Sequence, residues 1–404
     1  MIDRLMILFA SAMDHRRIDQ EHTPYLYSLS KRYPWTRITN FPEVDLDPTL
    51  FTGLYPHEHG MWQVRLKEDR NFDTKRTQDY LPDIITTTFQ CFIHSITGKF
   101  DLAGVPDWRR RRFEIFRTRY DNKVVSEYTM LNGFDTFFNI IGESNCNYIY
   151  NTKLHKLDQI KPDLFYKDLR FELIETHGLD TISHWYIDNK RKMIDTYNNV
   201  DRFIKYLHSQ CEMMGITLMI LAEHGMELVK NSIDIIQKIN ELGIRNNEIT
   251  YYIEASKVRF WFHSDSAREK MLNYLSGNPD GVLLSRQDMH EFNVKFEDDS
   301  YGEYYFVLNV GTIFFPNDFY QPLGNLYLGL TNKQARSRLF NPAHRGYHGH
   351  LPHNDSEKGT LMLLNGDYKT NRDEIQTIDF APTVLTLLGY DKPDSLKGTS
   401  AFHR

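Results

Sequence analysis

The hydrophobic residues of the chain gather in short apolar runs, separated by polar stretches rich in turn-forming residues. The clearest run lies within residues 215–226, which are apolar for most of their length and then stop at Glu223, His224 and Gly225. A short apolar run without alternation predicts a strand that is covered on both faces, as in a parallel sheet flanked by helices. Ligands of such sheets bind beyond the carboxyl ends of the strands. We therefore expect Glu223 and His224 to project into a functional site.

Comparable patterns predict the rest of the core, in which strands alternate with helices as in an α/β protein. The longest predicted helix carries apolar side chains at helical spacing and leads directly into the run at 215–226. A proline near the first turn marks the start of another helix, and a glycine marks the end of the last one. The predicted strands cover residues 4–12, 171–175 and 359–365, and the predicted helices begin at Pro24 and cover residues 186–213 and 378–389.

Two long segments lack the pattern of a core. Residues 63–145 are charged, aromatic and irregular, without a long apolar run, and this predicts an insertion or lid. Residues 227–340 predict a second insertion, with a helix over 233–242 and strands over 258–263 and 304–315.

The length, cysteine content and net charge of the chain limit the classes of protein to which it can belong. With 404 residues, of which 41% are hydrophobic, the chain can bury a sizeable core. Its cysteines, Cys91, Cys146 and Cys211, are widely spaced and form no CxxC pair. We therefore expect neither a disulfide framework nor a zinc site made of cysteines, and we expect a cytoplasmic location. The apolar N-terminal stretch is too short to span a bilayer. A net charge of −6 argues against a general nucleic-acid binder.

A basic run, residues 109–112 with Arg117 and Arg119 beyond, is the main exception to this charge balance. Such a run is most often a solvated helix face, and a grip on an anionic substrate is the alternative.

Three separate islands carry side chains of the kind that bind metals. The first is Asp180 with His184, the second is Glu223 with His224, and the third is a group of histidines in a glycine-containing loop. Carboxylate oxygen and imidazole nitrogen are the usual ligands of catalytic zinc and similar divalent ions. A single island is more often structural, but each of these ends a predicted strand or lies in a glycine loop. The histidines of the third island are His344, His348, His350 and His353.

A set of motifs spread along the whole chain is similar to those of the alkaline phosphatase superfamily. Their order and spacing resemble most closely its branch of type I phosphodiesterases and nucleotide pyrophosphatases. The motifs are Thr23-Pro24-x-Leu26, Thr52-Gly53-Leu54-Tyr55-Pro56-x-x-His59-Gly60, Asp180-x-x-x-His184, Val200-Asp201-Arg202, Glu223-His224-Gly225-Met226, Tyr347-His348-Gly349, and Asp379-Phe380-Ala381-Pro382-Thr383 with Leu387-Leu388-Gly389.

This resemblance implies a single α/β domain over residues 1–404. It has a mostly parallel central sheet sandwiched by helices and two insertions that form a cap. The resemblance also implies one or two divalent ions at the carboxyl edge of the sheet, with zinc expected and manganese or iron as alternatives. Carried over by position, Asp180, His184 and His348 form one metal site. Glu223 and His224 belong to the other.

The sequence departs from the family pattern in the second metal site. The first strand of the family ends in a metal-binding Asp, whereas this chain has Ser11-Ala12-Met13 there and Asp14 about a turn later. The Asp expected before His224 is Glu223, which reaches one methylene further.

The position of the nucleophile differs as well, because no hydroxyl or thiol occupies it. Counting back from Thr52 gives Glu43, and counting forward from Phe41-Pro42 gives Asp45. Such a carboxylate could ligate the metal and leave a bound water to attack, or it could form an acyl phosphate. Thr49 could also move into this position. Finally, the acids could only brace a loop in a protein that has lost phosphatase chemistry.

We therefore expect a divalent-metal-dependent hydrolase or transferase that acts on a phosphate ester, a phosphodiester or a nucleotide-like anion. The expected partner is a small anionic substrate, with no nucleic-acid polymer and no membrane, and a homo-oligomer is compatible with the sequence. The alternatives are a non-catalytic scaffold and a mononuclear metal enzyme built on the first site alone.

Overall fold

The computed structural model describes residues 2–40, 46–60, 62, 65–67, 113–115, 135–151, 154–318 and 344–404. The chain divides into two compact units. The first contains residues 1–62, 117–227 and 351–404, and the second contains residues 63–116 and 228–350. The predicted insertions, 63–145 and 227–340, stay predictions, and the basic run at 109–112 lies outside the described residues.

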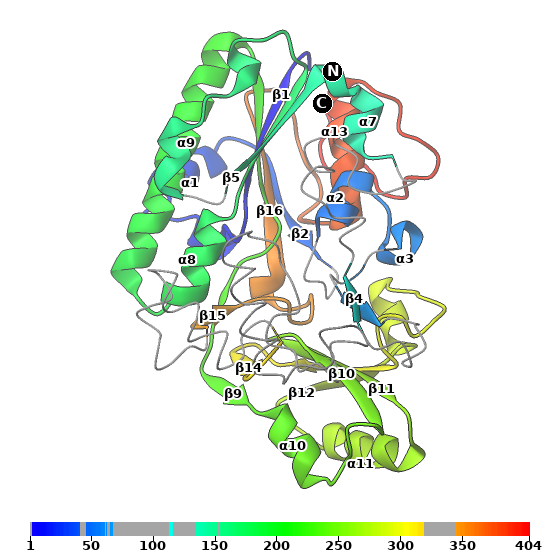
Figure 1. Cartoon of the computed structure of the whole chain (residues 1–404). Coiled ribbons are helices and arrows are strands. Elements are labelled where there is room, and N and C mark those ends of the chain that lie inside the picture. Colours follow the sequence, from blue (N-terminus) through cyan, green and yellow to red (C-terminus); the bar gives the residue numbers. More distant parts are fainter. Residues whose placement is uncertain are drawn as a thin grey trace, which may run out of the picture. The chain divides into compact units, whose positions relative to one another are not determined.

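The first unit is built on a seven-stranded sheet with the order β17-β2-β16-β7-β1-β6-β5 (Figure 1). Neighbouring strands pair in parallel except at β16, which runs antiparallel to both β2 and β7. The predicted mostly parallel sheet is thereby confirmed. The strands are β1 Leu5–Ala10, β2 Trp35–Thr39, β5 Cys146–Asn151, β6 Phe171–Thr176, β7 Thr217–Ala222, β16 Lys358–Leu364 and β17 Glu374–Gln376.

The apolar runs of the sequence form the middle of this sheet because both of its faces are covered. Every residue of β1, β6 and β7 is buried. Helices α1, α8 and α9 lie on one side of the sheet, and α2, α7 and α13 lie on the other (Figure 1). The helices of this unit are α1 Pro24–Ser30, α2 Asp47–Thr52, α3 Pro56–His59, α7 Phe137–Ile141, α8 Gly178–Tyr186, α9 Lys190–Met214 and α13 Phe380–Leu388.

The second unit contains a four-stranded antiparallel sheet with the order β10-β11-β13-β12. Apolar side chains of this sheet, such as Phe260 and Phe306, share a core with Ile239 of α10 and Met271 of α11. Its elements are α10 Ile235–Glu241, β10 Ile249–Ile253, β11 Lys257–Phe262, α11 Asp265–Ser276, β12 Gly281–Ser285 and β13 Tyr304–Leu308.

The remaining elements are short. The strands are β3 Arg65–Lys67, β4 Phe113–Ile115, β8 Glu227–Leu228, β9 Asn231–Ile233, β14 Thr312–Phe314 and β15 Gly346–Tyr347. The 3-10 helices are His15–Arg17, Glu143–Asn145, Leu154–Gln159, Asp163–Phe165, Asp288–Phe292, Asp355–Glu357 and Thr377–Asp379.

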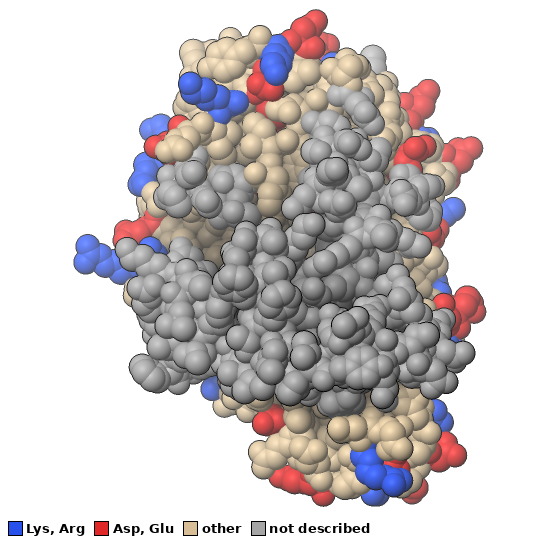
Figure 2. Space-filling model, in the orientation of Figure 1, with Lys and Arg blue, Asp and Glu red and all other residues tan. Residues whose placement is uncertain are grey.

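The surface carries acidic and basic side chains side by side. Figure 2 shows both kinds scattered over the described part of one face. None of the helices in the described part of the chain combines the length and the hydropathy needed to cross a bilayer.

Candidate functional site

The candidate site of the first unit lies where β1, β6 and β7 end. These three strands are adjacent and parallel, so their carboxyl ends meet at one edge of the sheet. The chain continues from β1 into Ser11, from β6 into His177 and α8, and from β7 into Glu223 and His224. This is the edge at which open α/β sheets bind their ligands.

Asp180 and His184 lie one turn apart on α8. The Asp180 Oδ1 to His184 Nε2 distance is 3.4 Å, so the two side chains share a face of the helix. Both side chains are mostly buried. A Cβ atom at Gly178 would lie 2.7 Å from the backbone nitrogen of Leu154, so only glycine lets the first turn of α8 approach this segment.

Glu223 and His224 form a buried ion pair directly after β7, with 3.3 Å between Glu223 Oε1 and His224 Nε2. The hydroxyl of Ser11 donates a hydrogen bond of 2.6 Å to the same oxygen. Burial would raise the pKa of Glu223, but His224, His177 and Ser11 together lower this pKa to about 2. The other oxygen, Oε2, is buried without a hydrogen-bond partner among the described residues.

The imidazole of His224 is held in one orientation. Its Nδ1 lies 2.8 Å from the carbonyl oxygen of Gly225 and donates to it, which leaves Nε2 as the nitrogen that could bind an ion. Burial opposes the charged form, but Glu223 and then Asp180 raise the pKa of His224 to about 9. An ion would therefore displace a proton from this ring.

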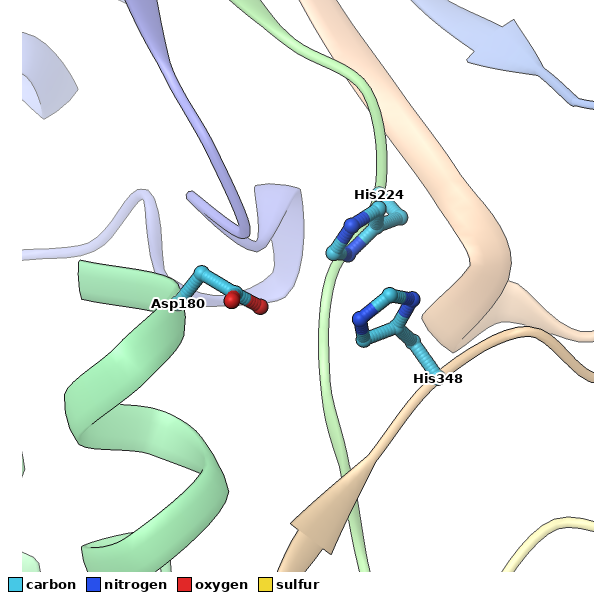
Figure 3. Close-up of side chains that lie close together, drawn as sticks. All are labelled: Asp180, His224 and His348. Atoms are coloured by element: carbon cyan, nitrogen blue, oxygen red, sulfur yellow. The ribbon is translucent and has the colours of Figure 1, made fainter. Parts of the chain in front are cut away.

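The structure brings the first two predicted islands together, since Asp180 acts electrostatically on His224 and its carboxylate points toward that ring (Figure 3). Asp180 and His224, both in the first unit, could each offer one ligand atom to a metal ion. His348 belongs to the second unit, as do His344 and His350.

The other histidines of the third island have different surroundings. His344 and His350 are buried, and His350 Nε2 lies 3.5 Å from the carbonyl oxygen of Thr312. His353 is exposed and belongs to the first unit.

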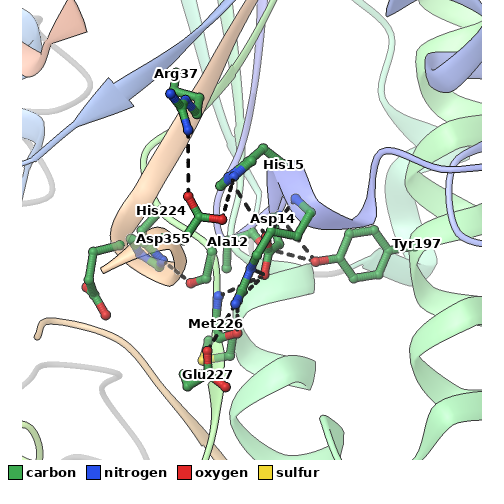
Figure 4. A network of polar contacts seen from close by, with 12 residues as sticks. Ala12, Asp14, His15, Arg37, Tyr197, His224, Met226, Glu227 and Asp355 are labelled. Carbon is green, nitrogen blue, oxygen red and sulfur yellow. Dashed lines mark hydrogen bonds and ion pairs between the residues drawn. The ribbon is translucent and has the colours of Figure 1, made fainter. Parts of the chain in front are cut away.

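Asp14 takes part in a separate network beside the site (Figure 4). Both of its carboxylate oxygens accept hydrogen bonds from Arg16, the shortest being 2.7 Å. Arg16 also donates to the carbonyl oxygen of Met226 and to Glu227, at 2.8 Å and 3.0 Å. A Cβ atom at Gly225 would lie 2.8 Å from Asp14 Oδ2. Asp14 thus braces the loop that follows His224.

A second pair at this edge, Glu175 and His177, was not identified from the sequence. Glu175 lies in the fully buried strand β6, and its side chain bonds to the imidazole of His177. The signal that could have found it is an acid near the end of a predicted core strand, followed two residues later by a histidine.

Of the three predicted nucleophile candidates, only Thr49 lies among the described residues. Thr49 is fully buried in α2, where its hydroxyl lies 2.9 Å from His59 Nε2. Burial lowers the pKa of His59 to about 3, so this ring is neutral. Glu43 and Asp45 lie outside the described residues.

Comparison with known proteins identifies the family. A family model described as type I phosphodiesterase / nucleotide pyrophosphatase matches residues 18–295. The chain belongs to this family. No curated protein sequence matches it.

Solved structures support the same fold for this phosphodiesterase family member. Murine ectonucleotide pyrophosphatase / phosphodiesterase 5 superposes with a TM-score of 0.65 at 11% identity, covering 96% of each chain. An inactive variant of the murine protein, in complex with AMP, gives a TM-score of 0.65 at 12% identity and covers 97% of this chain and 96% of that one. The human protein gives 0.63 at 12% identity, covering 98% and 97%.

The residues at this edge fit a divalent ion. Glu223 presents a buried carboxylate oxygen without a described hydrogen-bond partner, and the Nδ1 bond of His224 directs Nε2 away from the backbone. Oxygen and nitrogen donors of this kind suit zinc, manganese and iron alike. In this phosphodiesterase family member the first unit alone supplies Asp180, His184, Glu223 and His224.

Proposed function

We propose that this protein is a divalent-metal-dependent hydrolase or transferase that acts on a phosphate ester, a phosphodiester or a nucleotide-like anion. The observation that carries the proposal is the convergence of Asp180, His184, Glu223 and His224 at one edge of the sheet, together with the buried oxygen Oε2 of Glu223. Oε1 of Glu223 is paired with His224 and Ser11, but a buried oxygen without a hydrogen-bond partner such as Oε2 is costly, and a bound cation would offset this cost.

The proposed metal ligands come from the first two islands of the sequence and from the histidine loop. Asp180, His184 and His348 would hold one ion, and Glu223 with His224 would belong to the other, with zinc expected and manganese or iron as alternatives. Bound ions would polarise the phosphoryl oxygens and lower the pKa of an attacking water. The hydroxyl of Ser11 donates a hydrogen bond to Glu223 and so orients its carboxylate. The carbonyl oxygen of Gly225 accepts a hydrogen bond from His224 and so orients its imidazole.

The proposed attacking group is a water or a carboxylate, not a hydroxyl of the chain. Thr49 is fully buried against His59, so it could reach a substrate only if α2 were rearranged. Glu43 and Asp45 are the acids at the sequence positions where the family carries its nucleophile.

Turnover and metal content test the proposal together. The protein is stripped with a chelator, reloaded with zinc, manganese or iron, and assayed with bis(p-nitrophenyl) phosphate and with the p-nitrophenyl ester of thymidine 5′-phosphate. The nucleotide ester is included because the murine relative is described in complex with AMP. We expect turnover that requires metal and falls about 100-fold or more in His184→Ala, because a ligand is lost.

The control is His403→Gln, which changes an exposed histidine whose backbone pairs with Lys369. It should retain the activity and metal content of the parent. Absence of turnover and of bound metal under every loading condition would overturn the metalloenzyme and favour a scaffold. Unchanged turnover in His184→Ala would remove the site assignment.

The identity of the attacking group is tested with Glu43→Gln and Asp45→Asn. Loss of the nucleophile should reduce kcat on the order of 10⁴-fold. A single turnover in ¹⁸O water separates the two chemistries: direct attack by water puts the label in the phosphate, whereas hydrolysis of an acyl phosphate at its carbonyl puts it in the carboxylate. Label in the phosphate and full activity in both variants would exclude a carboxylate nucleophile.

A further inference from the structure

Glu175 is an acid within a strand that is buried on both faces. It is fully buried, and its neighbours in β6 include Phe171, Leu173 and Ile174, which are also fully buried. Its two carboxylate oxygens have different partners: the hydroxyl of Tyr148 in β5 donates to one, and the imidazole of His177 lies against the other. Burying a carboxylate carries a desolvation penalty that its hydrogen-bond and charge partners must offset. The packing of the sheet alone does not require this acid.

His177 is fixed at the carboxyl end of β6 by this contact. Its Nε2 faces Glu175, and its ring lies 5.4 Å from the ring of Tyr150 and 6.4 Å from that of Phe9, measured between centroids. The side chain is 29% exposed, in contrast to Glu175. Within the described part of the chain, Nδ1 of His177 has no hydrogen-bond partner. A tethered ring therefore presents its second nitrogen where a ligand can reach it.

The charge of this ring is set by the acids around it. Burial would lower the pKa of His177, but the bond to Glu175 and the charges of Glu175, Glu223 and Asp180 raise it to about 10. Tyr148 and Tyr150 are the other titratable groups that face the pair, from β5. His177 is thus an imidazolium at neutral pH, and Nδ1 carries a proton.

If His177 only stabilised the fold, its contact with Glu175 through Nε2 would be sufficient. A counter-ion for Glu175 requires Nε2, and Tyr148 already satisfies the other oxygen. It does not require a second N–H that is exposed at the edge of the sheet, close enough to Asp180 and Glu223 for their charges to act on it. An exposed cationic N–H donor beside candidate metal ligands suits an anionic oxygen.

We propose that His177 is an anion-binding residue that donates Nδ1–H to a non-bridging oxygen of the substrate's phosphoryl group, with Glu175 and Tyr148 as its positioning residues. The inference rests on the proposed phosphohydrolase function. It adds a substrate class, because a fixed cation favours phosphoryl groups with two negative charges, as in a phosphate monoester or the product of diester cleavage, over the single charge of a diester.

The first test compares two anions that differ in charge, inorganic phosphate and dimethyl phosphate. Their binding to the metal-loaded protein is measured by calorimetry at pH 8 for the parent, His177→Gln and the control His403→Gln. A side-chain amide retains a donor but not the charge. We expect His177→Gln to weaken phosphate roughly 10- to 100-fold, as for a charge-assisted hydrogen bond, and dimethyl phosphate less than about 3-fold. Metal content should match the parent, and the variant should remain folded under the conditions of the titration.

A second variant guards against a simple folding defect. Glu175→Gln keeps the size and hydrogen-bonding capacity of the side chain but removes the charge that holds the proton on His177. It should also weaken phosphate more than dimethyl phosphate at pH 8. Equal losses for both anions, or no loss, in a folded and metal-loaded variant would overturn the inference.

The two proposals fail in distinguishable ways. If His177→Gln weakens phosphate more than dimethyl phosphate but the parent never turns over an ester, the hydrolase fails and the anion site stands. If the parent turns over substrates while His177→Gln binds phosphate as tightly as the parent does, the anion site fails and the hydrolase stands.

Discussion

The hydroxyl of Ser11 determines how Glu223 is oriented. It lies at the end of β1 and donates to Glu223 Oε1, so that Oε2 remains the oxygen without a described partner. The extra methylene of Glu223 and the short side chain of Ser11 therefore complement each other. In this arrangement Asp14 is not needed in the site, and its carboxylate instead binds Arg16.

Ser11→Ala should weaken metal binding without removing a ligand. The loss of a hydrogen bond that orients a ligating carboxylate typically costs about 10-fold or more in affinity. A competition titration of the metal-loaded protein against a chelator measures this change. Ser28→Ala is the matched control, since the hydroxyl of Ser28 bonds to the carbonyl oxygen of Tyr25 on α1. Equal metal affinity in both variants would show that Ser11 does not orient the site.

His59 should make the folded protein sensitive to acid. Its pKa is about 3 in the folded chain, below the ordinary value of 6.5. Below pH 6.5 the unfolded chain takes up a proton that the folded chain does not, so stability falls as the pH drops toward 3, by up to about 1.4 kcal/mol per pH unit.

Urea unfolding at pH 7 and pH 5 tests this dependence. His59→Gln should be less stable at pH 7 by about 1–3 kcal/mol, because the buried hydroxyl of Thr49 loses its partner. Between pH 7 and pH 5 it should lose less stability than the parent. His403→Gln, at an exposed position, should retain the dependence of the parent. A parallel loss in His59→Gln would show that His59 is not the cause.

Site residues differ in how far sequence alone reveals them. Asp180 and His184 were predicted as a pair because a spacing of four residues is local information, and in the structure they share a face of α8. The pair of Glu175 and His177 could not be predicted in the same way, since its significance depends on Tyr148 from a neighbouring strand. The roles of Glu43, Asp45 and Thr49 stay predictions.

At the level of elements, the start of α1 is capped by a residue from another helix. Asp201, in α9, accepts hydrogen bonds from the backbone nitrogens of Tyr25 and Leu26, at 2.9 Å and 2.8 Å. Thr23, at the N-cap position of α1, makes no such bond with its side chain. One carboxylate therefore ties together α1 and α9, two of the helices on one side of the sheet.

Asp201→Ala should destabilise the protein by about 1–3 kcal/mol, because two buried backbone donors lose their acceptor. Asp195→Ala is the control, since this residue lies on the exposed face of the same helix. Urea unfolding compares the two, and we expect less than about 0.5 kcal/mol for the control. Similar values for both variants would indicate that the cap does not stabilise α1.

The ends of helices and strands could be predicted from the sequence where a local signal, such as a glycine, marks them. The closing helix ends at Gly389, which adopts a φ of 81°, as the glycine indicated. The helix expected from residue 186 begins instead at Lys190, because the side chain of Asn189 accepts a hydrogen bond from the backbone nitrogen of Lys192 and caps it there. Residues 304–315 form two strands, β13 and β14, rather than a continuous one.

At the scale of the whole molecule, metal should contribute to stability as well as to catalysis. An ion that binds only the folded chain, at a free concentration 100-fold above its Kd, would stabilise the protein by about 2.7 kcal/mol. Removal of metal by a chelator should therefore lower Tm, and zinc should restore it.

Differential scanning calorimetry of His224→Ala provides the contrast for this experiment. This variant lacks a proposed ligand, so chelation should change its Tm much less than it changes that of the parent. His403→Gln should behave as the parent does. An identical chelator effect in His224→Ala would mean that the ion binds elsewhere.

The order of motifs along the chain predicted the fold of the first unit, because a parallel sheet with covering helices depends on periodicities and turn signals that are read locally. It did not predict the strand order, since pairing between distant segments leaves no local trace. The antiparallel direction of β16, between β2 and β7, is one such feature.

The central position of β1 has a consequence for synthesis of the protein. Leu5 pairs with Phe171 in β6 and with Thr217 in β7, so this apolar strand leaves the ribosome long before either partner exists. At 5–20 residues per second the wait is roughly 10–40 s. Throughout that time the nascent chain exposes a segment of the kind that aggregates readily. Folding of the newly made protein without aggregation therefore depends on shielding of residues 5–10 until β7 emerges.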